Sequence, residues 1–139
     1  MESTTLRTLT QLDHVRLQGL LARGRHTSVA ADAGEAVQDL LDASEVVPSP
    51  QVSPTVVTMY SQVVLEDPAD ASHRTITLCY PQDSEPASGL VSVLSPMGIA
   101  LLGLQVGDLA CWSLPNGTQH HARVHAVPYQ PEAQGDYLR

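Results

Sequence analysis

The sequence of 139 residues is long enough for one ordinary domain with an appendage and too short for two large cores. Its formal net charge of −8, with seven arginines and no lysine, argues against a nucleic-acid-binding protein, because phosphate binding requires clustered positive charge. No apolar run approaches the roughly 20 residues of a membrane-spanning helix, and the N-terminal segment MESTTLRTLTQLD lacks the apolar core of a secretory signal. We therefore expect a cytoplasmic protein that contacts neither nucleic acid nor membrane directly.

The first predicted element is a helix within a helical pattern that runs over residues 6–24. Leucines recur along one side of this segment at helical spacing. Thr10 or Asp13 is suited to cap the N-terminus, and Gly24 is suited to end the helix. This spacing predicts a helix of about four turns.

A second amphipathic helix is predicted over residues 29–45. Its apolar residues fill one arc, and its carboxylates fill the opposite arc, namely Asp32, Glu35, Asp39, Asp42 and Glu45. Asp42 and Glu45 lie where the helix dipole disfavours negative charge, so helix stability alone does not explain this acidic face. Because only the short turn GRHTS separates the two helices, we expect an antiparallel helical hairpin.

The segment VVPSPQVSP marks a change of pattern, since its prolines suit neither a helix nor a strand interior. It predicts a boundary between a helical hairpin, or short coiled coil, at residues 1–47 and a second domain at residues 48–139. Apolar residues after this boundary alternate with period two, which predicts an antiparallel sheet of about five strands. Asn116 and Gly117 predict a hairpin with a type I′ turn, in which both central residues have positive φ. The fold class is therefore α+β.

The stretch SPMGIALLG, residues 95–103, interrupts the predicted strands with a complete short helix. Ser95 can cap it, Pro96 suits the first helical position, and Gly103 can adopt the left-handed conformation that ends it. The apolar residues that follow can cover one face of the sheet. This account does not explain why the helix begins with Ser95, Pro96 and Met97 at an exposed end.

Three segments, VVTMYSQV, VSVLSPMGIALLGLQVGD and VPYQPEAQGDY, resemble the GreA/GreB transcription elongation factor family of RNA polymerase secondary-channel factors. The resemblance spans nearly the whole chain. SPMGIALLG and the following GD are shared across the family, whereas the tail is more specific to its regulators of nucleoside diphosphate kinase. The resemblance implies a helical hairpin followed by an FKBP-like domain with an antiparallel sheet and one short helix.

The same resemblance implies where the protein would contact RNA polymerase. In Gre factors the C-terminal domain docks on the rim of the secondary channel, and the residues that match the docking loop are Ser95, Pro96 and Met97. Leu94 stands where the family commonly has an aspartate, so this chain departs from the pattern at one polar contact. Candidate channel-facing residues are Arg23, Arg25, Asp32, Asp39 and Asp42.

The predicted hairpin differs from that of a cleavage factor. Gre factors carry two acidic residues at the hairpin tip that help to hold catalytic magnesium, whereas the turn GRHTS is basic, and Mg²⁺ requires oxygen ligands. We therefore predict a non-enzymatic regulator that occupies the channel entrance and excludes other factors without stimulating transcript cleavage. Its effect on nucleoside diphosphate kinase would be indirect, with direct binding to that kinase, through the acidic helix, as the alternative.

The remaining candidates for chemistry are weak. His121 and His125 share a predicted strand face but would lie about 13 Å apart, too far to chelate one ion, so we predict no metal site and no cofactor. Cys79 and Cys111 lie in apolar strand-like runs and are predicted to be reduced core residues. Prolyl isomerase activity is a further alternative implied by the FKBP-like fold, but a chain without Phe and with one Trp is poorly equipped for an aromatic pocket.

Overall fold

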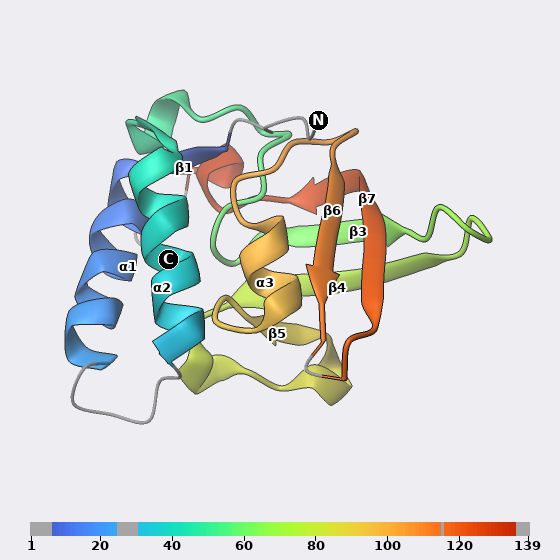
Figure 1. Ribbon diagram of the computed structural model, residues 1–139. Helices are drawn as coiled ribbons and strands as arrows, with labels where there is room; N and C mark the ends of the chain where they lie inside the picture. Colours follow the sequence, from blue (N-terminus) through green and yellow to red (C-terminus); the bar gives the residue numbers. More distant parts are fainter. Residues whose placement is uncertain (1–6, 25–30, 115, 136–139) are drawn as a thin grey trace.

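The computed structural model describes residues 7–24, 31–114 and 116–135 and has a mixed α+β architecture, with a curled five-stranded sheet and the helices gathered on one side (Figure 1). The helices are α1 (Gln11–Gly24), α2 (Ala31–Ala43) and α3 (Pro96–Leu101). The strands are β1 (Thr8–Thr10), β2 (Glu45–Val47), β3 (Gln62–Glu66), β4 (His73–Cys79), β5 (Leu90–Ser92), β6 (Leu109–Ser113) and β7 (Gln119–Tyr129). No helix in the described ranges is long and apolar enough to cross a membrane.

The two N-terminal helices lie side by side (Figure 1), and the 14 residues of α1 agree with the predicted length of about four turns. The first part of the helical pattern, before the predicted caps, is a strand: Thr8–Thr10 form β1, which pairs in parallel with β2. Thr10 then caps α1, since its Oγ1 accepts a hydrogen bond from the backbone N–H of Asp13 at 3.0 Å. The second helix ends at Ala43, because Glu45 already belongs to β2.

The five-stranded sheet has the order β5-β4-β3-β7-β6. The expectation of a wholly antiparallel sheet was wrong at one edge, where β5 pairs in parallel with β4. The connection between these strands contains two short 3₁₀ helices, Pro81–Asp83 and Pro86–Ser88, which carry the chain back beside β4. A tight hairpin between β4 and β5 would instead have made the two strands antiparallel.

The β6–β7 hairpin forms as predicted, but its turn is different. Ser113 pairs with Gln119, so the loop contains five residues rather than two. A type I′ turn needs positive φ at both central residues. Gly117 has φ of +87° but Asn116 does not have a positive φ, so the type I′ assignment was wrong. The backbone N–H of Gly117 donates to the carbonyl of Leu114 at 2.9 Å, which closes the tighter part of the loop.

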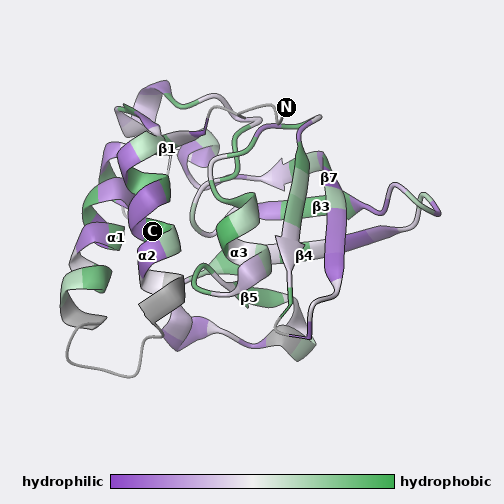
Figure 2. Ribbon diagram, viewed as in Figure 1, coloured by the Kyte–Doolittle hydropathy of each residue, from purple (hydrophilic) through white to green (hydrophobic). Residues whose placement is uncertain are grey.

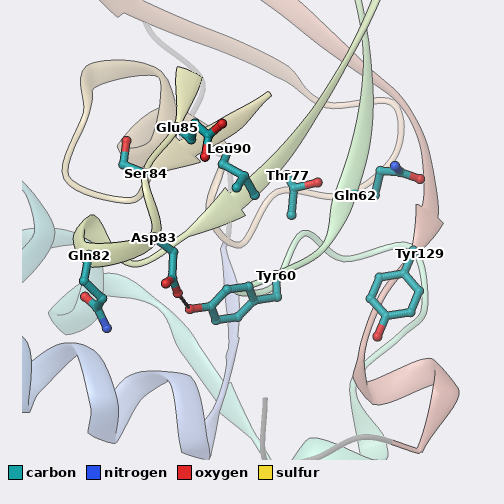
Figure 3. A pocket seen from close by; sticks show the side chains of 9 residues that line it. All are labelled: Tyr60, Gln62, Thr77, Gln82, Asp83, Ser84, Glu85, Leu90 and Tyr129. Carbon is teal, nitrogen blue, oxygen red and sulfur yellow. Dashed lines mark hydrogen bonds between the residues drawn. The ribbon is translucent and has the colours of Figure 1, made fainter. Parts of the chain in front are cut away.

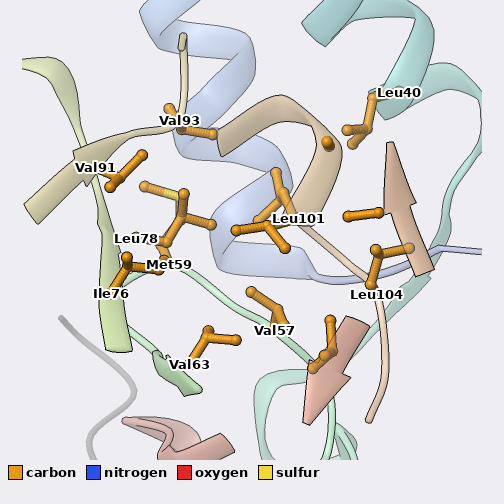
Figure 4. Close-up of a cluster of buried hydrophobic side chains, with 14 of the residues drawn as sticks. Leu40, Val57, Met59, Val63, Ile76, Leu78, Val91, Val93, Leu101 and Leu104 are labelled. Atoms are coloured by element: carbon orange, nitrogen blue, oxygen red, sulfur yellow. The ribbon is translucent and has the colours of Figure 1, made fainter. Parts of the chain in front are cut away.

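One cluster of buried apolar side chains joins the helices to the sheet, and it includes Leu17 of α1, Leu41 of α2 and Leu101 of α3. Figure 4 shows Leu101 close to Val57 at the centre of this cluster. In Figure 2 hydrophilic and hydrophobic residues alternate along α1 and α2, as expected for helices with one buried face. Residues on both sides of the predicted boundary at 47/48 share this core, and the boundary itself stays a prediction.

The two cysteines have different environments. Both are free thiols, and Cys79 is buried at the end of β4 as predicted. Cys111 is exposed, so its assignment to the core was wrong. Strand alternation explains the difference, because Ala110 on β6 is buried on the core face and its neighbour must point to the opposite face.

Candidate functional site

The strongest candidate site is the N-terminal end of α3, where the chain leaves the sheet through Ser95, Pro96 and Met97. Ser95 Oγ donates to the carbonyl of Ser92 at 2.7 Å and accepts from the backbone N–H of Gly98 at 3.0 Å. Pro96 occupies the first helical turn and is exposed. These contacts confirm the predicted cap and hold the first turn in one position.

Gly98 lets α3 approach the sheet more closely than any other residue would. A Cβ atom at this position would lie 2.1 Å from the carbonyl oxygen of Ser92 and 2.9 Å from the Cα atom of Val93. Both atoms belong to backbone and cannot rotate away. The glycine therefore fixes the depth at which the helix sits and, with it, the exposure of Pro96.

Arg7 anchors the other end of α3. One guanidinium nitrogen, Nη1, donates to the carbonyl of Ile99 at 2.6 Å and to that of Leu102 at 3.0 Å. Carbonyl groups in the last turn of a helix have no partner within the helix, so this contact satisfies two of them. Burial lowers the pKa of Arg7 from its usual high value, and the Asp108 carboxylate opposes this shift. The docking candidate is thus fixed at both ends.

A small groove of about 150 Å³ lies next to this helix, between Met97 and the β6–β7 hairpin. Trp112 and His120 face each other across that hairpin and stack, with ring centroids 5.8 Å apart and an interplanar angle of 13°. The described residues that line it are Leu65, Asp67, Ser72, Arg74, Met97, Trp112, His120, His121 and Ala122. Met97 is half-buried here, so the predicted docking residues continue into a recess of mixed polar and apolar lining.

The sequence-based prediction missed Trp112, His120 and Arg74 as neighbours of Met97. Trp112 and His120 come from the strands on either side of the predicted hairpin, and their pairing depends on the loop length. Arg74 lies on β4 and has no local signal that relates it to α3. The period-two pattern identified the strands but not which of their polar side chains would line the same recess.

The predicted channel-facing residues lie apart from α3 in the sequence, and four of the five, Arg23, Asp32, Asp39 and Asp42, belong to the two N-terminal helices. Arg23 is in the last turn of α1 and Asp32 in the first turn of α2, but the structure describes only their backbone. Arg25 lies outside the described residues. Asp39 and Asp42 are exposed on α2, and Asp42 accepts a hydrogen bond from Gln38 Nε2 at 3.0 Å.

Comparison with known proteins identifies the family. Residues 52–129 match the family model described as transcription elongation factor, GreA/GreB, C-term. The protein belongs to the GreA/GreB family. The matched segment includes all five strands of the larger sheet and the whole of α3, so the candidate site lies within it.

The relatives of this GreA/GreB-family protein include a regulator of nucleoside diphosphate kinase from Escherichia coli K12, which is 36% identical over 130 residues that cover 94% of each chain. A transcription elongation factor GreA from Solidesulfovibrio magneticus is 36% identical over 74 residues, which cover 53% of this chain and 45% of that protein. Among solved structures, a GreA/GreB factor from Nitrosomonas europaea has a TM-score of 0.74 at 33% identity, covering 88% of this chain and 99% of that one. These relatives are named as regulators and transcription factors rather than enzymes.

This member of the GreA/GreB family also has a larger hollow of about 900 Å³ on the sheet face opposite α3, formed by Gln62, Thr77 and Tyr129 with the loop after β4 (Figure 3). The Tyr60 hydroxyl donates to the Asp83 carboxylate at its edge. Burial and the Asp83 carboxylate raise the pKa of Tyr60 to about 12. Among the described residues, the lining is mainly polar and its aromatic members are Tyr60 and Tyr129, so it gives no support to an aromatic proline-binding pocket.

Proposed function

We propose that this GreA/GreB-family protein is a transcription regulator that binds RNA polymerase at the rim of the secondary channel. Ser95, Pro96 and Met97 supply the docking contacts. The protein competes with Gre-type factors there without stimulating transcript cleavage, and it affects nucleoside diphosphate kinase levels indirectly. It acts in the cytoplasm and is not an enzyme.

The observation that carries this proposal is the fixed and exposed entry of α3. Pro96 is exposed although it belongs to an apolar helix, and the contacts of Ser95 and Arg7 hold the helix at both ends. A rigid surface loses little conformational entropy on binding, so such an element is suited to protein recognition. The recess beside Met97, where Trp112 and His120 stack, adds an anchor point for a partner side chain.

The absence of cleavage stimulation rests on the length and charge of the N-terminal helices. The 14 residues of α1 span about 21 Å, which is short for a probe of a deep channel. The sequence contains no carboxylate between Asp13 and Asp32, so the segment joining the helices offers no magnesium ligands of the kind that cleavage requires. We also propose that residues 1–47 form a helical hairpin and that residues 48–139 form a domain with the FKBP-like fold.

Displacement of a bound factor tests the proposal. A labelled GreB-type factor on core RNA polymerase is titrated with the wild type and with Pro96→Asp, while transcript cleavage is followed in parallel. Aspartate is tolerated in the first turn of a helix, so the variant is expected to fold. We expect displacement by the wild type, a loss of at least about tenfold in the variant, equivalent to about 1.4 kcal/mol, and no cleavage by this protein alone.

The matched control is Pro54→Asp, which makes the same change at an exposed proline remote in sequence from α3. It should compete like the wild type. If the wild type fails to displace the factor, or if both variants compete equally well, docking through α3 is wrong.

The alternative is direct binding to nucleoside diphosphate kinase through α2. The observation that favours it is the exposed acidic row Glu35, Asp39 and Asp42, with no basic residue in the last turn to balance it. Such a face suits a basic partner surface. Co-sedimentation of the purified protein with the kinase, in the absence of polymerase, distinguishes this mode, and it should be lost in a Glu35→Gln/Asp39→Asn double variant.

A further inference from the structure

Three potential metal ligands from different strands meet on the sheet face opposite α3. Glu66 of β3 and His73 of β4 are directly paired, so their side chains leave the sheet on the same face. His125 of β7 lies two residues beyond Arg123, which is the partner of Glu66 on the other side. Three adjacent strands thus bring together residues that are far apart in the sequence.

The side chains converge rather than merely share a face. His73 Nε2 lies 3.6 Å from Glu66 Oε2. The imidazole rings of His73 and His125 have centroids 4.4 Å apart and planes inclined by 32°. One ligand atom from each of the three residues lies within 4.8 Å of the other two. Ligand atoms on a tetrahedral zinc ion are roughly 3.4 Å apart, so small side-chain rotations would close the site.

The surroundings leave these ligands available. Arg123, which the strand register places opposite Glu66, donates through Nη1 to the carbonyl of Gly107 at 3.0 Å and so has a backbone partner of its own. Glu66 is half-buried, whereas His73 and His125 are exposed and can move without disturbing the core. A carboxylate and two histidines fixed on three hydrogen-bonded strands need little ordering to bind an ion.

In place of the prediction of no metal site, which considered only the spacing of His121 and His125 on one strand, we propose that Glu66, His73 and His125 form a binding site for a divalent transition metal of the zinc class. Two imidazole nitrogens and one carboxylate oxygen form a ligand set used by zinc, and a water molecule would complete the coordination. Imidazole ligands favour zinc, cobalt, nickel or copper over magnesium and calcium, which prefer oxygen. The ion would link β3, β4 and β7 on the face opposite the docking helix.

Metal titration of the untagged full-length protein tests this proposal. Isothermal titration with Zn²⁺ gives the affinity, and the visible absorption of bound Co²⁺ reports imidazole ligands and low coordination number. We expect one ion per chain for the wild type and no comparable binding of Mg²⁺. His73→Ala, His125→Ala and Glu66→Gln should each weaken zinc binding by at least about tenfold.

His121→Ala is the matched control, because His121 lies on the same strand and the same face as His125 but outside the cluster. It should bind zinc like the wild type. Thermal unfolding with and without Zn²⁺ gives a second readout: the midpoint should rise in the wild type and the control but not in the three ligand variants. If zinc binds all variants equally, or if His121→Ala loses as much affinity as His125→Ala, the assignment is wrong.

Discussion

Asp13 is the residue whose environment is least expected from the sequence. It is 1% exposed, and its Oδ2 accepts a hydrogen bond from the backbone N–H of Met59 at 3.1 Å. Its Oδ1 has no hydrogen-bond partner among the described residues. Burial raises the pKa of Asp13 from 3.8 to about 7, and the nearby Glu132 carboxylate contributes to the rise. The carboxyl group therefore binds a proton more tightly in the folded protein than in the unfolded chain.

This shift predicts how stability depends on pH. Between about pH 4 and pH 7 the folded state binds more protons at Asp13 than the unfolded state, so its contribution to the free energy of unfolding falls as pH rises through this window. Asp13→Asn removes the charge and can keep the Met59 contact. We expect the variant to be more stable than the wild type at pH 8, by up to about 4 kcal/mol, and the difference to shrink toward pH 5.

Urea denaturation of both proteins across this pH range measures the effect. The informative quantity is the difference between the two proteins at each pH, because carboxylates that do not interact with Asp13 contribute equally to both. Parallel stability profiles from pH 4 to pH 8 would show that Asp13 titrates normally in the folded state.

At the scale of single elements, α3 shows how close packing overrides helix propensity. Alanine is favoured over glycine within a helix by about 1 kcal/mol. If only local structure mattered, replacing Gly98 by alanine would therefore stabilise the protein. Its position 2.1 Å from the Ser92 carbonyl oxygen, measured from an ideal Cβ, reverses that expectation. The helix is held against β5 by a contact that only glycine allows.

We therefore predict that Gly98→Ala destabilises the protein by about 1–3 kcal/mol, because helix or strand backbone must move to accept the methyl group. Gly34→Ala on α2 is the matched control, since its Cβ would meet only Leu21 Cδ2 at 3.8 Å. This second change should be neutral or stabilising. Urea denaturation of both variants decides the point, and equal stabilisation by the two alanines would mean that α3 does not pack closely on β5.

At the scale of the whole molecule, the N-terminal segment connects the helices to the docking element. The backbone N–H of Thr8 donates to the carbonyl of Gly103 at 3.1 Å, and Arg7 contacts the last turn of α3. The backbone N–H of Glu45 donates to the carbonyl of Arg7 at 2.9 Å, which joins the same segment to the end of α2. Arg7 and Thr8 thus connect the N-terminal segment to the end of α2 and to the end of α3.

Arg7→Met tests this connection, because it keeps most of the apolar stem and removes the two hydrogen bonds to α3. We expect a loss of about 1–3 kcal/mol in the free energy of unfolding. In hydrogen exchange, the amides at the C-terminal end of α3 should exchange faster. Arg74→Met, at an exposed arginine, is the control and should leave those amides unchanged. Unchanged exchange in Arg7→Met would show that α3 is stable without its anchor.

Local signals were sufficient where a residue's role depends on its near neighbours. Ser95, Pro96 and Gly103 were predicted as cap, first helical residue and left-handed end, and the structure has them so, with φ of +84° at Gly103. The docking role of Ser95, Pro96 and Met97 stays a prediction. The type I′ turn was wrong because a loop is shaped by the whole hairpin, and a two-residue loop would have paired Trp112 with His121 instead of His120.

The sequence by itself determined the helices, most of the strands, the capped α3 and the family. The helices, strands and cap depend on periodicity and capping chemistry, which act over a few residues. The family is recognised from short motifs in the sequence. Only the tertiary structure decided that Arg7 anchors α3, that Asp13 is buried against Met59, and that Glu66, His73 and His125 converge. The reason is physical: strand register and burial are set by contacts between distant segments, and no local pattern records which of them will meet.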